Sequence, residues 1–94
     1  MPDTLKDKVA IVTGSGQGIG KAIAKVFAAH GASLVVATRT EKYGRETVDE
    51  ITAAGGEASL CTADVGKVAD IERIVTVAIE TYGKIDIMVQ NAGI

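Results

Sequence analysis

The chain has 94 residues, of which 47% are hydrophobic and 23% charged, and its formal net charge is -2. This length allows at most one domain, and the composition is typical of a soluble α/β protein. The basic residues are scattered and the aliphatic runs are short, so the sequence predicts no nucleic-acid-binding surface and no membrane span. The N-terminal residues lack a signal-peptide pattern, which predicts a cytoplasmic location.

The only cysteine and the only histidine are both expected to be structural. One cysteine cannot form an internal disulfide, and no Cys-x-x-Cys pattern points to a metal site. Cys61 lies in an apolar, strand-like run and is expected in the core. His30 ends a helical pattern just before Gly31, where it is expected to contact the last carbonyl groups of that helix.

The first half of the chain predicts two buried strands, each followed by a helix. The strands are expected over residues 8–12 and 33–38, because both are short, β-branched apolar runs. Thr40 is placed to cap the second helix with its hydroxyl, and Gly44 interrupts that helix before it ends at Gly55 or Gly56. The first helix runs from about position 19 to the glycine at position 31, and its core-facing residues are Ile19, Ala22, Ile23, Val26 and Phe27.

The second half adds a third strand over residues 57–65, a helix over residues 71–82 and a fourth strand over residues 84–90. The helix has the clearest amphipathic pattern in the chain, and Gly83 ends it. The fourth strand runs into a turn at residues 91–93. The core-facing residues of the helix are Ile71, Ile74, Val75, Ala78, Ile79 and Tyr82.

The element order is therefore βαβαβαβ. Short connections between alternating strands and helices require a parallel sheet with helices on both faces. Right-handed crossovers and a reversal of the winding direction give the strand order 3-2-1-4. We predict a three-layer, Rossmann-type doubly wound α/β fold that is partial and occupies residues 1–94 as one unit.

Residues 13–22 read TGSGQGIGKA and join the first strand to its helix, where backbone N–H groups bind phosphate in many proteins. The P-loop spacing fails because Gly14 lies one residue too far from Gly20, and Ala22 replaces the required hydroxyl. The G-x-G-x-x-G fingerprint fails because Ile19 stands where the third glycine belongs.

The pattern that remains is Gly14-x-x-x-Gly18-x-Gly20. Gly14 allows a tight turn, Gly18 lets a phosphate approach bare backbone, and Gly20 lets the helix pack close to the sheet. Lys21 is left as a solvated helix residue. The alternative is a glycine-rich turn that binds nothing, since such patterns also arise by chance.

TGSGQGIG resembles the T-G-x-x-x-G-x-G cofactor loop of the short-chain dehydrogenase/reductase family. ADV at residues 63–65 resembles the family's D-V motif, and QNAG at residues 90–93 resembles its N-N-A-G motif, with Gln90 in place of the usual first Asn. The resemblance covers essentially the whole chain. It implies an NAD(P)-dependent oxidoreductase that interconverts an alcohol and a carbonyl by hydride transfer, with this chain carrying the adenosine and pyrophosphate part.

The resemblance also assigns roles to individual residues. Asp64 would bind adenine, with the Val65 backbone beside it, although a plain turn-forming role is the alternative for Asp64. The turn at residues 91–93 would line the ribose side, and the hydroxyls of the loop would shape the phosphate site. The expected cofactor-binding residues are Thr13, Gly14, Ser15, Gln17, Gly18, Ile19, Gly20, Thr38, Arg39, Asp64, Val65, Asn91, Ala92 and Gly93.

The end of the second strand indicates which dinucleotide is preferred. An acid here would accept a hydrogen bond from the ribose 2′-hydroxyl of NAD, but the chain has Thr38 followed by Arg39. The guanidinium of Arg39 can pair with a 2′-phosphate, which favours NADP. NAD is the alternative, because Arg39 can also be a solvated loop residue. In addition, Gln17 stands where NADP-preferring relatives often carry a basic residue.

The family's catalytic Y-x-x-x-K motif is absent, since Tyr43 is followed four residues later by Thr47 and Tyr82 by Asp86. Both tyrosines are expected to be packing residues. No catalytic or metal-binding residue is predicted in this chain, and an alcohol or carbonyl substrate and a homo-oligomer belong to a longer form.

The 94-residue chain alone is expected to be marginally stable, weak in cofactor binding and inactive, with its fourth strand exposed at one edge. The alternative function is a short non-catalytic nucleotide-binding or interaction module.

Overall fold

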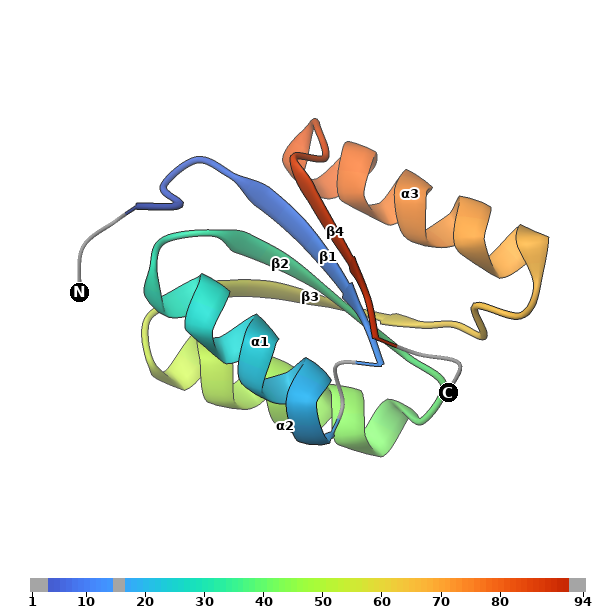
Figure 1. Cartoon of the computed structure of the whole chain (residues 1–94), viewed down its shortest axis with the longest axis horizontal. Helices are drawn as coiled ribbons and strands as arrows, with labels where there is room; N and C mark the ends of the chain where they lie inside the picture. Colours follow the sequence, from blue (N-terminus) through green and yellow to red (C-terminus); the bar gives the residue numbers. More distant parts are fainter. Residues whose placement is uncertain (1–3, 15–16, 92–94) are drawn as a thin grey trace.

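The computed structural model describes residues 4–14 and 17–91 as three helices alternating with four parallel strands. The strands form one sheet in the order β3-β2-β1-β4, which confirms the predicted topology (Figure 1). The elements are β1 (Val9–Thr13), α1 (Gly18–Ala29), β2 (Ser33–Thr38), α2 (Glu41–Ala53), β3 (Glu57–Thr62), α3 (Val68–Tyr82) and β4 (Ile87–Gln90).

The bounds of β2 match the prediction, and the boundaries of the other elements differ from it by up to three residues. β1 extends to Thr13, and β3 ends at Thr62 rather than at position 65. α3 begins at Val68, three residues before the predicted start, and Lys67 is its N-cap. The apolar pattern marks where a helix meets the core, and the first turn of α3 lies before that contact.

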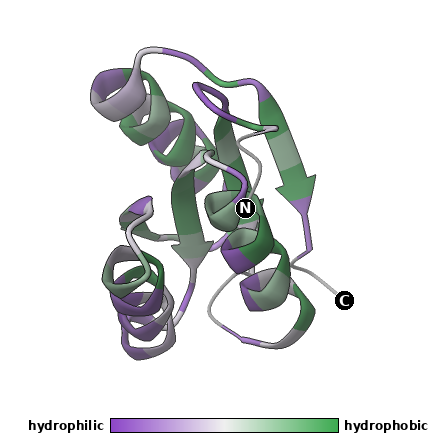
Figure 2. Ribbon diagram, turned by 90° about the vertical axis from the view of Figure 1, so that its left-hand side faces the viewer, coloured by the Kyte–Doolittle hydropathy of each residue, from purple (hydrophilic) through white to green (hydrophobic). Residues whose placement is uncertain are grey.

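Successive side chains of each strand point to opposite faces of the sheet and so build two cores. Ala10 and Val12 of β1 belong to the core under α1 and α2, whereas Ile11 belongs to the core under α3. Figure 1 shows α1 and α2 together on one face and α3 alone on the other. The strands between them are mostly apolar, whereas each helix has polar and apolar sides (Figure 2).

Five residues expected in the core are instead exposed, including Ile19 and Ala22 at the start of α1. Val26 of α1 is 55% exposed, and Val75 and Ile79 of α3 are 37% and 47% exposed. Only Ile74 and Ala78 of α3 are fully buried, because the described part of the sheet covers a narrower strip of this helix than its apolar pattern spans. The predicted core-facing stripes of α1 and α3 were therefore wider than the faces that the structure buries.

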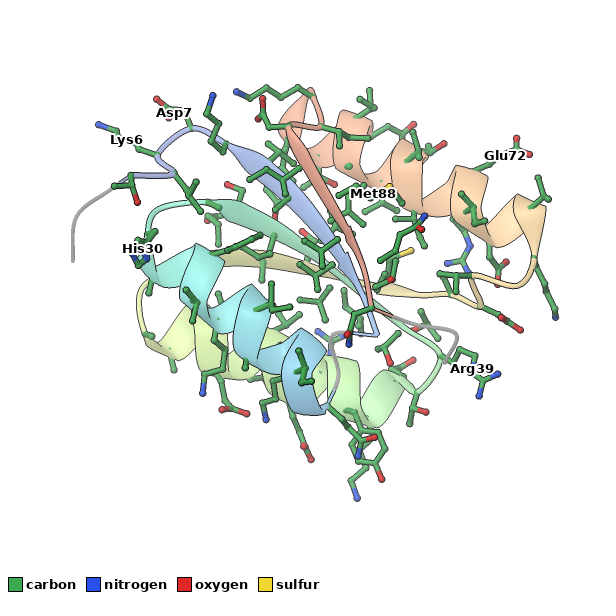
Figure 3. All side chains as sticks on the ribbon, viewed as in Figure 1. Lys6, Asp7, His30, Arg39, Glu72 and Met88 are labelled. Carbon is green, nitrogen blue, oxygen red and sulfur yellow. The ribbon has the colours of Figure 1, made fainter. Side chains whose placement is uncertain are left out.

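An apolar side chain is also exposed at the edge of the sheet, on β4. β4 pairs with β1 on one side, and within residues 4–14 and 17–91 no strand pairs with its other side. Met88 is paired in register with Ile11, extends on the side of α3 (Figure 3) and is 41% exposed. An unpaired apolar edge of this kind favours pairing with another strand.

The helix ends follow the sequence in two of three cases. Nδ1 of His30 lies 3.1 Å from the carbonyl oxygen of Val26, which confirms the predicted contact at the end of α1. Gly83 adopts a left-handed conformation, with φ of 84°, and ends α3 as predicted. Thr40 is the N-cap residue of α2, but its hydroxyl makes no capping hydrogen bond, so that expectation was wrong.

Lys21 was predicted to be a solvated helix residue, but in the structure it forms an ion pair. Its ammonium group pairs with the carboxylate of Glu50 on α2, and Lys25 pairs with the same carboxylate at 2.9 Å. Hydrogen bonds from these two lysines lower the pKa of Glu50. Residues one turn apart on α1 therefore converge on a single acid, which ties the two helices together at their exposed surface.

Gly44 does not interrupt α2, which continues through it. A Cβ atom at this position would lie 2.6 Å from Cγ2 of Thr38 and even closer to Cδ1 of Leu60. The absence of a side chain lets the first turn of α2 rest directly on β2 and β3. Gly44 is thus a close-packing position. The close contact with β2 and β3 explains why a residue of low helix propensity stands in this helix.

We expect Gly44→Ala to lower the free energy of unfolding by about 1 to 3 kcal/mol, because the added methyl group overpacks the interface. At an ordinary exposed helix position the same change would stabilise the helix. Urea unfolding followed by circular dichroism measures the difference. Arg45→Ala, at the exposed neighbouring position, is the control and should change stability by less than about 0.5 kcal/mol. A stabilised Gly44→Ala variant would contradict the packing argument.

Candidate functional site

The hydroxyl of Thr13 joins the carboxyl ends of β1 and β4. Its Oγ1 donates to the carbonyl oxygen of Val89 at 3.3 Å and accepts from the backbone N–H of Asn91 at 3.0 Å. Thr13 is 1% exposed, so this connection is shielded from water. It fixes Asn91 beside the start of the glycine loop.

The three glycines of the predicted motif differ in their structural requirement. Gly14 and Gly18 have φ values of 63° and 58°, a region that side chains other than glycine rarely occupy. Gly20 is buried, and a Cβ there would lie 2.7 Å from Nδ2 of Asn91 and closer still to the carbonyl oxygen of Gly14. The start of α1 is thereby pressed against the end of the sheet.

A groove of about 590 Å³ opens at the carboxyl ends of β1, β2 and β3. This volume is in the range of small-molecule sites, and ligands of open α/β sheets bind at this edge. The groove is lined by Gly14, Gln17, Ala37, Thr38, Arg39, Thr40, Tyr43, Ala63, Asp64, Val65 and Gly66. Six of these residues are among those expected to bind the cofactor.

Two chain segments leave the sheet together and then separate to form the walls of the groove. The backbone N–H of Ala63 donates to the carbonyl oxygen of Thr38 at 2.9 Å, which continues the ladder between β2 and β3. Beyond this bond one segment enters α2 on one face of the sheet, and the other leads to α3 on the opposite face. The groove lies between them.

Asp64 forms a local turn at the edge of the groove. Its Oδ1 accepts a hydrogen bond from the N–H of Gly66 at 2.8 Å, which is the turn-forming role considered as the alternative. Its own N–H donates to Oδ2 of Asp70 at 2.8 Å. The side chain lines the groove at the same time, so the turn and a contact with a ligand are compatible.

Asp70 fastens this turn to α3. The hydrogen bond from the N–H of Asp64 lowers the pKa of the Asp70 carboxyl, and the nearby guanidinium of Arg73 lowers it further. Arg73 also donates to the carbonyl oxygen of Thr62 at the end of β3. One signal in the sequence indicates this role, namely an acidic residue in the first turn of a helix.

Arg39 extends from the loop after β2 into solvent at the carboxyl end of the sheet (Figure 3). Thr38 and Arg39 both line the groove, and no acid stands at either position. The groove therefore has a positive charge at the mouth beside β2 and a carboxylate on the wall after β3.

Comparison with known proteins matches residues 8–94 to the family model for short chain dehydrogenase. The chain belongs to the short chain dehydrogenase family. It is 47% identical over 93% of its length to an uncharacterized oxidoreductase of Thermotoga maritima, of which it covers 34%. It is 46% identical over 98% of its length to a hydroxynaphthalene reductase-like protein of Metarhizium brunneum, of which it covers 35%.

Solved structures of oxidoreductases share the fold. A hydroxysteroid dehydrogenase from Escherichia coli matches with a TM-score of 0.94 and 43% identity over 97% of this chain and 39% of its own. A 7α-hydroxysteroid dehydrogenase complexed with NADH and 7-oxo glycochenodeoxycholic acid also matches with a TM-score of 0.94 and 43% identity, over 97% of this chain and 36% of its own. The chain thus spans about a third of the length of its relatives.

Some predicted site residues of the chain lie beside the groove rather than in its lining. Thr13, Gly20 and Asn91 pack beneath the glycine loop, and Ile19 on α1 is 72% exposed. Ser15, Ala92 and Gly93 lie outside the described residues.

Sequence reasoning missed five lining residues. Ala37, Thr40, Ala63 and Gly66 flank predicted ones and could have been included for that reason. Tyr43 was interpreted as a packing residue, and its position in the first turn after the β2 loop was the available signal. The prediction for Tyr82 was right, because its hydroxyl lies 2.9 Å from Oγ of Ser59 at the α3 face, and burial raises its pKa.

Among the described residues, no three acidic, histidine or cysteine side chains form a group that could hold a metal ion. Within the same residues, no helix is both long and apolar enough to span a membrane. Cys61 is 3% exposed and lies in the core, as predicted, where burial raises its pKa.

Asp70→Asn tests the attachment of the groove wall to α3. The pKa of Asp70 is lowered in the folded state, so its contribution to stability is present above the ordinary aspartate pKa of about 3.9 and disappears as the pH falls further. We expect Asp70→Asn to be less stable than the parent chain at pH 7, with the difference shrinking below about pH 4.

Urea unfolding from pH 7 to pH 3 measures this difference. Asp49→Asn, at an exposed position of α2, is the matched control and should show no such trend. A pH-independent difference for Asp70→Asn would show that the charge of Asp70 is not what fastens the turn.

Proposed function

We propose that this chain is the adenosine- and pyrophosphate-binding part of an NADP-preferring oxidoreductase that interconverts an alcohol and a carbonyl. The observation that carries the proposal is the groove, which combines the glycine loop, Arg39 and Asp64 at one end of the sheet. Membership of the short chain dehydrogenase family and the NADH bound to the related hydroxysteroid dehydrogenase support the binding of a nicotinamide dinucleotide.

In this proposal each part of the groove binds one part of the dinucleotide. Backbone N–H groups at the start of α1, beside Gly14 and Gln17, bind the pyrophosphate. Asp64 accepts a hydrogen bond from the adenine, and Val65 packs beside it. When bound, the dinucleotide supplies the hydride acceptor or donor, and the residues of this chain orient it.

The preference for NADP rests on Thr38 and Arg39. Neither residue offers a carboxylate to a ribose 2′-hydroxyl, whereas the guanidinium of Arg39 offers several donors and a positive charge to a 2′-phosphate. Because the side chain of Arg39 is exposed at the groove mouth, it is accessible to a phosphate group of a bound dinucleotide.

The chain alone is proposed to bind cofactor weakly and to have no turnover, because its sequence contains no Y-x-x-x-K motif. A cytoplasmic location remains a prediction for this chain, and an alcohol or carbonyl substrate and a homo-oligomer remain predictions for a longer form. Oxidation of an alcohol by the 94-residue chain with NADP, measured at 340 nm, would contradict this part of the proposal.

Arg39→Ala tests the cofactor preference. We expect its affinity for NADPH to fall about ten- to a hundredfold, since a hydrogen bond between charged groups is lost, while its affinity for NADH stays unchanged. Isothermal titration calorimetry at low ionic strength measures both affinities. Arg45→Ala, an exposed arginine on α2 that does not line the groove, is the matched control. Tighter binding of NADH by the parent chain, or an equal loss for both cofactors, would overturn the preference for NADP.

A further inference from the structure

Among the described residues that line the groove, Tyr43 alone has an aromatic side chain. The chain is poor in aromatic residues, with two tyrosines, one phenylalanine and no tryptophan. The ring of Tyr43 is half-buried, and its neighbours in the lining are small or polar. An aromatic face at this position is therefore a distinct feature of the groove.

Two contacts hold the Tyr43 backbone in place. Gly44 seats the first turn of α2 against Thr38 and Leu60, where a Cβ atom would lie under 3.0 Å from both side chains. One turn later, the hydroxyl of Thr47, a residue that is 0% exposed, donates to the carbonyl oxygen of Tyr43 at 3.1 Å. The position of Tyr43 is thus set by the core rather than by the loop that precedes it.

The opposite wall of the groove carries one aliphatic side chain, Val65, next to the carboxylate of Asp64. It consists of residues 63–66, which separate from the β2 end after the hydrogen bond between Ala63 and Thr38. Val65 is partly buried against the core under α3, which fixes this wall to the other face of the sheet. An aromatic ring on one wall and an aliphatic side chain on the other suit a flat, apolar-faced group between them.

We propose that Tyr43 binds the adenine ring of the dinucleotide by stacking, with Val65 on the opposite side. This inference rests on the proposed function, since it requires an adenine nucleotide in the groove. The base has a π face that stacks on a tyrosine ring. Arg39, in the same lining, is then free to bind the 2′-phosphate rather than to cover the base.

The test measures binding of adenosine 2′,5′-bisphosphate to the 94-residue chain by calorimetry. We expect Tyr43→Phe to retain the parent affinity to within about twofold. Tyr43→Leu keeps an apolar side chain but removes the aromatic face, and both it and Tyr43→Ala should lose about tenfold or more. Tyr82→Phe changes the other tyrosine, away from the groove, and should bind like the parent chain.

A spectroscopic measurement on the parent chain is independent of variant folding. Nuclear Overhauser effects between the ring protons of Tyr43 and the H2 or H8 protons of adenine support stacking, and their absence in the bound state overturns it. Full affinity in Tyr43→Leu, or a loss in Tyr43→Phe as large as in Tyr43→Ala, also overturns the inference while leaving the proposed function intact. If the parent chain does not bind the bisphosphate, the proposed function fails, and this inference fails with it.

Discussion

The buried hydroxyl of Thr13 is the interaction on which the site depends. By donating to Val89 and accepting from Asn91, it joins two strands that are 76 residues apart in sequence. These strands lie side by side where the winding direction of the sheet reverses, and the glycine loop, which contributes Gly14 and Gln17 to the groove, leaves the sheet at this place. The bridge holds Asn91, against which Gly20 packs at the start of α1.

Close backbone contact extends this constraint to both helices beside the loop. Gly20 brings α1 onto Gly14 and Asn91, and Gly44 brings α2 onto Thr38 and Leu60. Each helix start is thereby held at the carboxyl edge of the sheet, next to the groove that Gln17 and Tyr43 line. The two glycines serve one purpose, although only Gly20 belongs to a recognisable motif.

The walls of the groove are stabilised independently of each other. Thr47 and the α1–α2 core hold the wall that carries Tyr43, whereas Asp70 holds the wall that carries Asp64 from the other face of the sheet. A groove between two separately anchored walls is open before a ligand enters. The fold therefore supplies the shape of the site, and binding a ligand costs little conformational entropy in the groove walls.

The sequence predicts the order of elements, the strand order and the glycine loop, because apolar periodicity and glycine spacing are local signals. Contacts between distant segments leave weaker signals. The bonds from Asp70 to Asp64 and from Lys21 to Glu50 depend on how two elements pack, which no single stretch of sequence records. The sequence predicts Tyr43 only as a packing residue, because an aromatic residue in a helix has the same pattern whether it packs against the fold or lines a site.

The exposed apolar residues have a similar origin. Val26, Val75 and Ile79 fit the helical periodicity, but periodicity does not say how much of the sheet is present to cover them. The chain spans about a third of its relatives' length, so a prediction based on a complete core overestimates burial in this part.

The central claim is that an adenine dinucleotide binds at the carboxyl edge of β1, β2 and β3. Chemical-shift mapping of the ¹⁵N-labelled 94-residue chain with NADPH tests it most directly. We expect the perturbed amides to cluster at Gly14, Gln17, residues 38–43 and residues 63–66, with little change at Lys25 and Glu50 on the exposed surface of α1 and α2. Saturable perturbations centred on Lys25 and Glu50, or none at the groove at saturating NADPH, would contradict the account.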